Sequence, residues 1–150
     1  MSGPGAVRDY GDLLRRLRAT VRSHVCSEVI GNVDGCPLLR LALGEERAER
    51  ALLIAGTHGD EPAGVETLVE LLAQPPAPWL ERLSFDVLPC TNPSGYAQAT
   101  RENAAGLDLN WSWDRDDIPE VEVLRRFLRG RHYLFILDLH EDWESPGFYM

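Results

Sequence analysis

The chain has 150 residues, of which 44% are hydrophobic and 26% are charged, enough for one domain with a buried core. Its net charge of −9 argues against nucleic acid and anionic membrane surfaces as partners, because both would repel it. All 15 basic residues are arginine, which excludes lysine Schiff-base enzymes and P-loop phosphate binders.

The first part of the chain predicts a helix, a hairpin and a buried strand. After a small flexible lead at 1–6, apolar residues at helical spacing predict an amphipathic helix over 7–22. Strand-like runs at 24–31 and 37–43 flank Asn-Val-Asp-Gly, a favourable hairpin turn. The continuous apolar run at 50–55 predicts a strand buried on both faces. The apolar face expected for the helix consists of Val7, Tyr10, Leu14, Leu17 and Val21.

The second part alternates helices with strands. A helix starts at Pro62 and ends at a proline-rich stretch, and a strand follows at 83–88. A long polar loop runs from 91 to about 117, and loops of that length are usually functional or disordered. Pro119 suits the first turn of another helix, and 132–139 predicts a further strand of the buried type.

This alternation predicts an α/β fold, which we expect to be a three-layer sandwich around a mixed, mostly parallel sheet. In such sheets ligands gather at the carboxyl ends of the strands. Polar pairs follow three of the predicted strands: Thr57-His58, Thr91-Asn92 and His140-Glu141. Their expected convergence is the main architectural reason to predict a functional site there.

The cysteines and two of the histidines predict no site of their own. Cys26, Cys36 and Cys90 are odd in number and widely spaced, so they form neither a disulfide framework nor a zinc knuckle. We expect each to be a small buried hydrophobic residue. His24 and His132 lie at strand starts and are interpreted as structural. The chain shows no signal peptide or membrane span, and we expect it to be cytoplasmic.

Two histidines and a glutamate predict a metal site. His58 and Glu61 lie in His-Gly-Asp-Glu at a strand-to-helix corner, where positions i and i+3 are within about 7 Å at the backbone. Catalytic zinc uses three protein ligands and one open position, and His140 at a strand end is the third candidate. Each feature has another interpretation. His58 and His140 could make structural hydrogen bonds, and Glu61 could cap the following helix.

The long loop contributes two further candidates. Arg101 could stabilise an oxyanion or hold a substrate carboxylate through its planar guanidinium. Asp108 could accept the ring proton of a ligating histidine and so fix its tautomer. The alternatives are a solvated surface charge for Arg101 and an Asx turn for Asp108.

Four ordered motifs, HGDEPAG, NPSGY, TRENAAGLDLN and LDLHED, lie within residues 54–142. Together they resemble the zinc carboxypeptidase family, which is carboxypeptidase A-like in fold, and its relatives aspartoacylase and succinylglutamate desuccinylase. The resemblance implies one Zn²⁺ ion held by His58, Glu61 and His140. It also implies that Arg101 faces the scissile carbonyl, that Asn110 helps grip the substrate carboxylate, and that Asp108 supports His58.

The sequence departs from the family in two ways. The family has an arginine after the Asn of this motif, whereas this chain has Trp111, which offers one N–H and no charge. Arg115 is a candidate substitute. The family's general base is a glutamate well downstream of the last ligand, and this chain has only Glu141, Asp142 and Glu144 after His140.

The resemblance implies zinc-dependent hydrolysis of a C-terminal peptide bond or a related amide, with a small peptide as substrate. The alternative is deacylation of an N-acyl amino acid, which Trp111 favours. A third interpretation is a non-catalytic zinc-binding fragment, because the general base is missing. We interpret 1–150 as the N-terminal, zinc-binding part of a single domain with a sheet that is incomplete at the C-terminus. An unfinished sheet exposes an edge that invites pairing with another chain.

Overall fold

Five strands form one mixed sheet. A computed structural model of the chain describes residues 7–45 and 49–142. Two strand pairs, β1–β2 and β2–β4, are antiparallel, and two, β3–β4 and β3–β5, are parallel. The sheet order is β1-β2-β4-β3-β5, with β1 (Val25–Val33), β2 (Cys36–Leu43), β3 (Arg50–Ala55), β4 (Ser84–Leu88) and β5 (Ile136–Leu139). The predicted α/β class and mixed sheet are confirmed, with parallel pairs making up half of the pairings.

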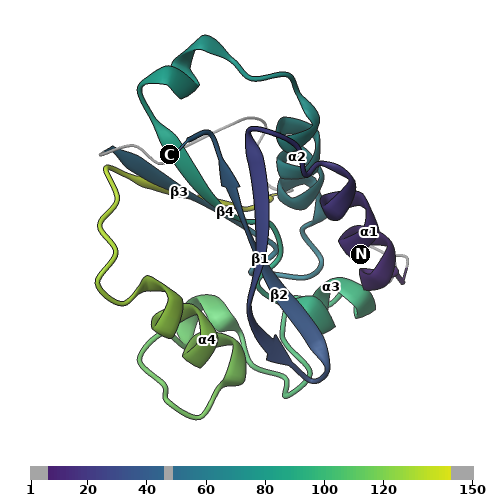
Figure 1. Ribbon diagram of the computed structural model, residues 1–150. Coiled ribbons are helices and arrows are strands. Elements are labelled where there is room, and N and C mark those ends of the chain that lie inside the picture. The colour runs from purple at the N-terminus through teal and green to yellow at the C-terminus, as the bar shows by residue number, and fades with distance from the viewer. Residues whose placement is uncertain (1–6, 46–48, 143–150) are drawn as a thin grey trace.

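Helices cover both faces of the sheet. In Figure 1, α1, α2 and α3 lie on one side and α4 on the other. The larger hydrophobic cluster joins the first three helices to one face, and a second cluster packs α4 on the opposite face. The three-layer arrangement is therefore confirmed. The helices are α1 (Tyr10–Ala19), α2 (Pro62–Ala73), α3 (Pro93–Gln98) and α4 (Pro119–Leu128), with 3₁₀ turns η1 (Pro78–Glu81) and η2 (Leu109–Trp111).

The first helix is shorter at both ends than predicted. The Asp9 side chain accepts a hydrogen bond from the Gly11 amide at 2.8 Å and caps α1 there. At the other end the Thr20 hydroxyl donates back to the carbonyl of the last helical turn. Val7 and Val21 lie outside these caps and are exposed, so they do not belong to the predicted apolar face.

The hairpin and the central strand follow the sequence closely. Asp34 and Gly35 both have positive φ, 48° and 79°, as a two-residue type I′ turn requires. This turn matches the right-handed twist of β1 and β2. In β3, residues 51–55 are all buried, as expected for a strand covered on both faces.

The last strand differs from its prediction. It begins at Ile136 rather than His132, and it is not buried: Ile136 is 58% exposed, and Leu134 and Leu137 are also exposed. The physical reason is its position at the edge of the sheet, next to β3 alone among the described strands. The apolar sequence therefore predicted the strand correctly, but the prediction that this strand is buried was wrong.

The predicted long loop at 91–117 contains two short helices. Asn92 caps α3 through a 2.9 Å bond from the Gly95 amide, and Pro93 occupies the first helical position. Asp108 caps η2 in the same way through the amide of Asn110. Local caps therefore order this segment, which has too few apolar residues to show helical periodicity.

The remaining predictions divide between described and undescribed residues. Cys90 is buried as predicted, whereas Cys26 is exposed on the edge strand β1, and Cys36 is partly buried at the start of β2, directly after the hairpin turn. The lead at 1–6, Glu144 and the Pro-Gly-Phe-Tyr-Met end lie outside the described residues. Within 7–45 and 49–142, no helix combines the length and apolar content needed to cross a bilayer.

Candidate metal centre

The strand-to-helix corner after β3 carries the first two predicted ligands. His58 lies in the turn after the strand and is 2% exposed, and Glu61 occupies the N-cap position of α2. The Glu61 carboxylate makes no capping hydrogen bond, so the capping interpretation of this residue is wrong. Its two oxygens instead bond to two histidine rings.

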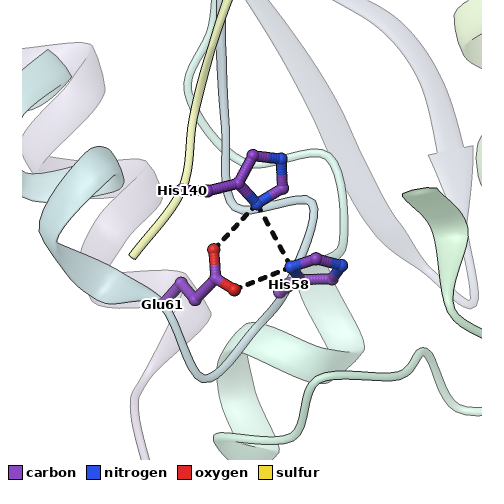
Figure 2. Close-up of side chains that lie close together, drawn as sticks. All are labelled: His58, Glu61 and His140. Carbon is purple, nitrogen blue, oxygen red and sulfur yellow. Dashed lines mark hydrogen bonds and ion pairs between the residues drawn. The ribbon is translucent and has the colours of Figure 1, made fainter. Parts of the chain in front are cut away.

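His140 completes the cluster from the neighbouring strand. The parallel pairing sets Ala55 of β3 opposite Leu139 of β5, so the residues that follow both strands meet at one edge. Figure 2 shows the two rings and the carboxylate pointing toward one another. Glu61 Oε1 lies 2.7 Å from His58 Nδ1, Glu61 Oε2 lies 2.8 Å from His140 Nδ1, and the two Nδ1 atoms are 3.1 Å apart.

This geometry fits a tetrahedral zinc ion with small adjustments. Zn–N and Zn–O bonds of about 2.0–2.1 Å place ligand atoms about 3.3 Å apart in a tetrahedron. The candidate ligand atoms all lie within 4.8 Å of one another. The three contacts above are shorter than the tetrahedral spacing by about 0.2 to 0.6 Å. Three protein ligands leave one tetrahedral position open, as in catalytic zinc sites.

A carboxylate stands behind each histidine. Asp108 Oδ1 lies 3.1 Å from His58 Nε2, and Asp138 Oδ2 lies 3.3 Å from His140 Nε2. Both rings therefore direct Nδ1 into the cluster and Nε2 toward an aspartate, the arrangement that orients metal-bound histidines. Asp138 was not predicted. Its position two residues before His140 is a usable signal, because strand alternation places i and i+2 on one side.

These contacts shift the protonation of the cluster. Hydrogen bonds with Asp138 and then Glu61 raise the pKa of His140 to about 10. Burial raises the pKa of Glu61, but hydrogen bonds from His140, the Glu141 amide and His58 outweigh it and lower the pKa overall. The cluster thus favours a cation beside Glu61, and a metal ion would compete with protons for the same atoms.

Arg101 and Asn110 lie beside this cluster. The Arg101 Nε donates to Asp108 Oδ2 at 2.9 Å, and its Nη1 lies 3.6 Å from Glu61 Oε1, with the side chain 44% exposed. Asp108 also accepts from the Asn110 amide, so it forms the Asx-type turn and supports His58 at once. Burial raises the pKa of Asp108, but bonds from Arg101, His58 and that amide lower it overall. Asn110 itself is exposed.

The two departures from the family motif have clear structural positions. Trp111 is 80% exposed on η2. Arg115 makes a two-point ion pair with Asp117, at 2.9 Å and 2.6 Å, so its guanidinium is already engaged by a carboxylate. Glu141 donates its amide to Glu61 and accepts from the Ala63 amide at 2.5 Å, which anchors His140 to α2.

Asn92 holds the loops of the site together. Its side chain is fully buried and donates to the carbonyls of Thr57 and Arg101, at 3.2 Å and 3.3 Å. It therefore links the segment before His58 to the loop that carries Arg101. The sequence placed Asn92 at a strand end but indicated no such role.

The other polar features lie apart from the cluster. His24 contacts the Gln74 carbonyl, and His132 is exposed, so neither joins the candidate ligands. A cleft of about 510 Å³ is lined by Arg40, Arg50 and Arg131 around Asp86, without any of the three ligand residues. Asp86 is fully buried and accepts from Arg40 at 2.8 Å and from the Tyr133 hydroxyl at 2.7 Å, which makes this group a structural ion-pair network.

Residues 47–149 match the family described as the succinylglutamate desuccinylase/aspartoacylase catalytic domain. Murein peptide amidase A of Vibrio campbellii is 32% identical over 73% of this chain and 55% of its own length. Murein peptide amidase A of Escherichia coli K12 is 37% identical over 62% of this chain and 37% of its own length. The chain thus spans about half or less of the length of these relatives.

Solved structures share the fold. A metallo-carboxypeptidase from Burkholderia cenocepacia superposes with a TM-score of 0.77 at 23% identity, covering 91% of this chain and 41% of the other. A metallo-carboxypeptidase from Pseudomonas aeruginosa gives a TM-score of 0.73 at 25% identity, covering 91% and 40%. The architecture of the described sheet and helices is therefore that of part of a carboxypeptidase fold.

Proposed function

Because the chain belongs to the succinylglutamate desuccinylase/aspartoacylase family, within the zinc carboxypeptidase-like hydrolases, we propose that it forms a zinc site for hydrolysis of a C-terminal amide bond in a short peptide. The observation that carries the proposal is the convergence of His58, Glu61 and His140, with an aspartate behind each histidine. The similarity to murein peptide amidases supports a peptide as the substrate.

Each residue of the site has a chemical role in this proposal. Zinc in a site of two histidines and one carboxylate supplies Lewis-acid activation of water and of an amide carbonyl. Arg101 places a positive guanidinium beside the cluster, where negative charge develops on the carbonyl oxygen during hydrolysis. Asp108 and Asp138 hold the rings in the tautomer that presents Nδ1 to the metal.

The first experiment tests the metal. We expect the purified chain to bind about one zinc ion per molecule, measured by mass spectrometry of the metal content after dialysis. His58→Ala and His140→Ala should lose this zinc, whereas His24→Ala, a histidine outside the cluster, should keep it. A metal-free wild-type chain would contradict the proposal.

The second experiment tests hydrolysis by the zinc-loaded protein. Among the described residues, the carboxylates that touch the cluster already have partners: Asp108 and Asp138 bond to ring nitrogens and Glu141 bonds to Ala63. These three carboxylates therefore hold the site together and are not positioned to act as a general base. Cleavage of blocked dipeptides and murein-derived peptides by the zinc-loaded protein, abolished in the His140→Ala variant, is the expected result.

Deacylation of an N-acyl amino acid is the second candidate. Trp111 favours it, because an exposed indole cannot hold a peptide carboxylate with a two-point charged bond, and Arg115 is paired with Asp117. A panel that compares peptides with N-acetyl-aspartate and N-succinyl-glutamate separates the two functions. Preference for the acyl amino acids would replace the peptide assignment while leaving the zinc site intact.

A further inference from the structure

We propose that Arg8 is a positioning residue for the metal centre, because its guanidinium fixes the backbone turn that carries His58. The inference rests on the proposed zinc site but concerns a residue outside the family match at 47–149. The segment before α1 would then support the metal site in addition to packing against the rest of the fold.

Arg8 bonds directly to the turn after His58. Its Nη1 donates to the Gly59 carbonyl at 2.7 Å and to the Tyr96 carbonyl at 3.3 Å. Gly59 and Tyr96 are both buried, so their carbonyls need a donor inside the protein. A charged donor makes such a bond stronger than a neutral one does. One side chain therefore ties the metal-binding turn to α3.

The turn needs this tie because it has no side chain of its own at position 59. A Cβ atom on Gly59 would lie 1.8 Å from the Gly95 carbonyl carbon, so the two backbones are in direct contact. Glycine permits that approach but leaves the peptide free to adopt many conformations. Asn92 fixes the residue before His58 through the Thr57 carbonyl, and Arg8 fixes the residue after it. His58 is thus held from both sides.

Arg8 is itself held in place. Its amide donates to the Ala97 carbonyl at 3.0 Å, and its guanidinium lies 5.3 Å from the centre of the Tyr96 ring, within cation–π range. The next residues cap and begin α1, where Tyr10 packs edge-to-face on the same Tyr96 ring. Figure 1 shows α1 close to α3, so the segment before α1 lies beside α3.

The test measures zinc affinity by competition with a chromophoric chelator. We expect Arg8→Ala to bind zinc about 10-fold more weakly, the lower end of the loss seen when residues supporting metal ligands are removed. Arg8→Lys keeps the positive charge and one nitrogen with several N–H donors, so it should recover most of the affinity. The matched control is Arg15→Ala, which removes an exposed arginine of α1 that pairs with Asp12 and should bind zinc as the wild type does.

A second readout separates positioning from general stability. The visible absorption of the Co²⁺-loaded chain reports ligand geometry, and Arg8→Ala should change it while Arg15→Ala does not. If Arg8→Ala does not fold, as judged by circular dichroism, Arg8→Gln carries the same measurements. Wild-type affinity and an unchanged Co²⁺ spectrum in folded Arg8→Ala or Arg8→Gln would overturn the inference, as would an equal loss in Arg15→Ala. A wild-type chain without zinc would defeat the proposed function itself.

Discussion

Asp108 and Asp138 occupy equivalent positions beside the two histidines of the candidate metal site. Each accepts from an Nε2 atom, at 3.1 Å and 3.3 Å, although one comes from a loop and the other from β5. Asp108 is also bonded to Arg101 and to the Asn110 amide, and Asp138 is bonded to the Thr57 hydroxyl. The orientation of both rings therefore depends on single carboxylates with several partners.

We predict that Asp108→Asn and Asp138→Asn each weaken zinc binding by about 10- to 100-fold. The carboxylate accepts the Nε2 proton of its histidine, whereas an uncharged amide holds that proton less strongly and so no longer fixes the ring tautomer. Chelator competition measures the affinity, and thermal melts check the fold. Asp114→Asn, in the exposed loop after η2, is the control and should bind zinc normally. Unchanged affinity in both variants would show that these carboxylates do not support the ligands.

Cys90 predicts a pH dependence of stability. Burial raises the pKa of its thiol to about 12, against about 8.5 for an exposed thiol. As the pH rises, the Cys90 thiol therefore loses its proton in the unfolded chain before it does so in the folded protein. The contribution of this thiol to the unfolding free energy is fully present below pH ~8.5 and is lost progressively toward pH 12. Between pH 8 and pH 10 the wild type should lose about 2 kcal/mol more of its unfolding free energy than Cys90→Ala loses.

Urea unfolding under reducing conditions at the two pH values measures this difference. Alkylation gives an independent reading, because exposed Cys26 should react at pH 8 while Cys90 reacts only after unfolding. Equal pH dependence in the wild type and Cys90→Ala would refute the assignment of the effect to this thiol.

At the scale of elements, the turn that carries His58 packs directly against α3. Gly59 and Gly95 lie back to back, and Gly95 in turn sits against the capping side chain of Asn92, where a Cβ would be 2.4 Å from Nδ2. Neither position has room for a methyl group. The site therefore depends on backbone packing that no side-chain pattern reveals.

We predict that Gly59→Ala lowers the unfolding free energy by about 3 kcal/mol or more, because backbone must move to relieve the overlap. Gly11→Ala is the control: this glycine lies in the first turn of α1, where alanine is the better helix former. Its stability should stay within about 1 kcal/mol of the wild type. Chemical denaturation compares the two variants, and equal behaviour would contradict the close packing.

Elements with strong periodicity or clear punctuation were predictable from the sequence. β3 is a continuous apolar run, α2 and α4 begin at prolines, and the hairpin turn carries Asp34 and Gly35. The burial of β5 was not predictable, because an apolar strand reads alike at the centre and at the edge of a sheet. α3 was missed because Asn92 and Pro93 define it by capping rather than by periodicity.

The same division applies to the candidate site. Motif spacing and the strand-end rule brought together His58, Glu61 and His140, which the structure places in contact. Arg8 and the Gly59–Gly95 contact could not be found this way, because they join segments 51 and 36 positions apart without any local pattern. Long-range backbone contacts depend on the packed fold rather than on neighbouring residues.

At the scale of the whole molecule, the two edges of the sheet differ. β1 at one edge carries mostly polar exposed residues, with Val29 an exception at 52% exposed. β5 at the other edge continues a run of exposed apolar side chains that also includes Leu134, Phe135 and Leu137. Such an edge is where a further strand pairs most favourably.

We predict that the 150-residue chain self-associates through β5 in a concentration-dependent way, measured by size-exclusion chromatography with light scattering. Ile136→Lys should shift the chain toward monomer, because a charge on an exposed edge opposes strand pairing. Val29→Lys places the same charge on the opposite edge and should leave association unchanged. A monomeric wild type at all concentrations would rule out this edge as a contact surface.

The separation of His58 and His140 along the chain has a consequence for folding. The two residues are 82 positions apart, yet their ring nitrogens meet at 3.1 Å. An ion bound by both would close a loop of that length only after β5 has docked beside β3, and closing long loops costs entropy that the unfolded chain retains. Zinc binding would therefore stabilise the chain only after β5 has paired with β3. The rate of zinc uptake during refolding would then report the rate of that pairing step.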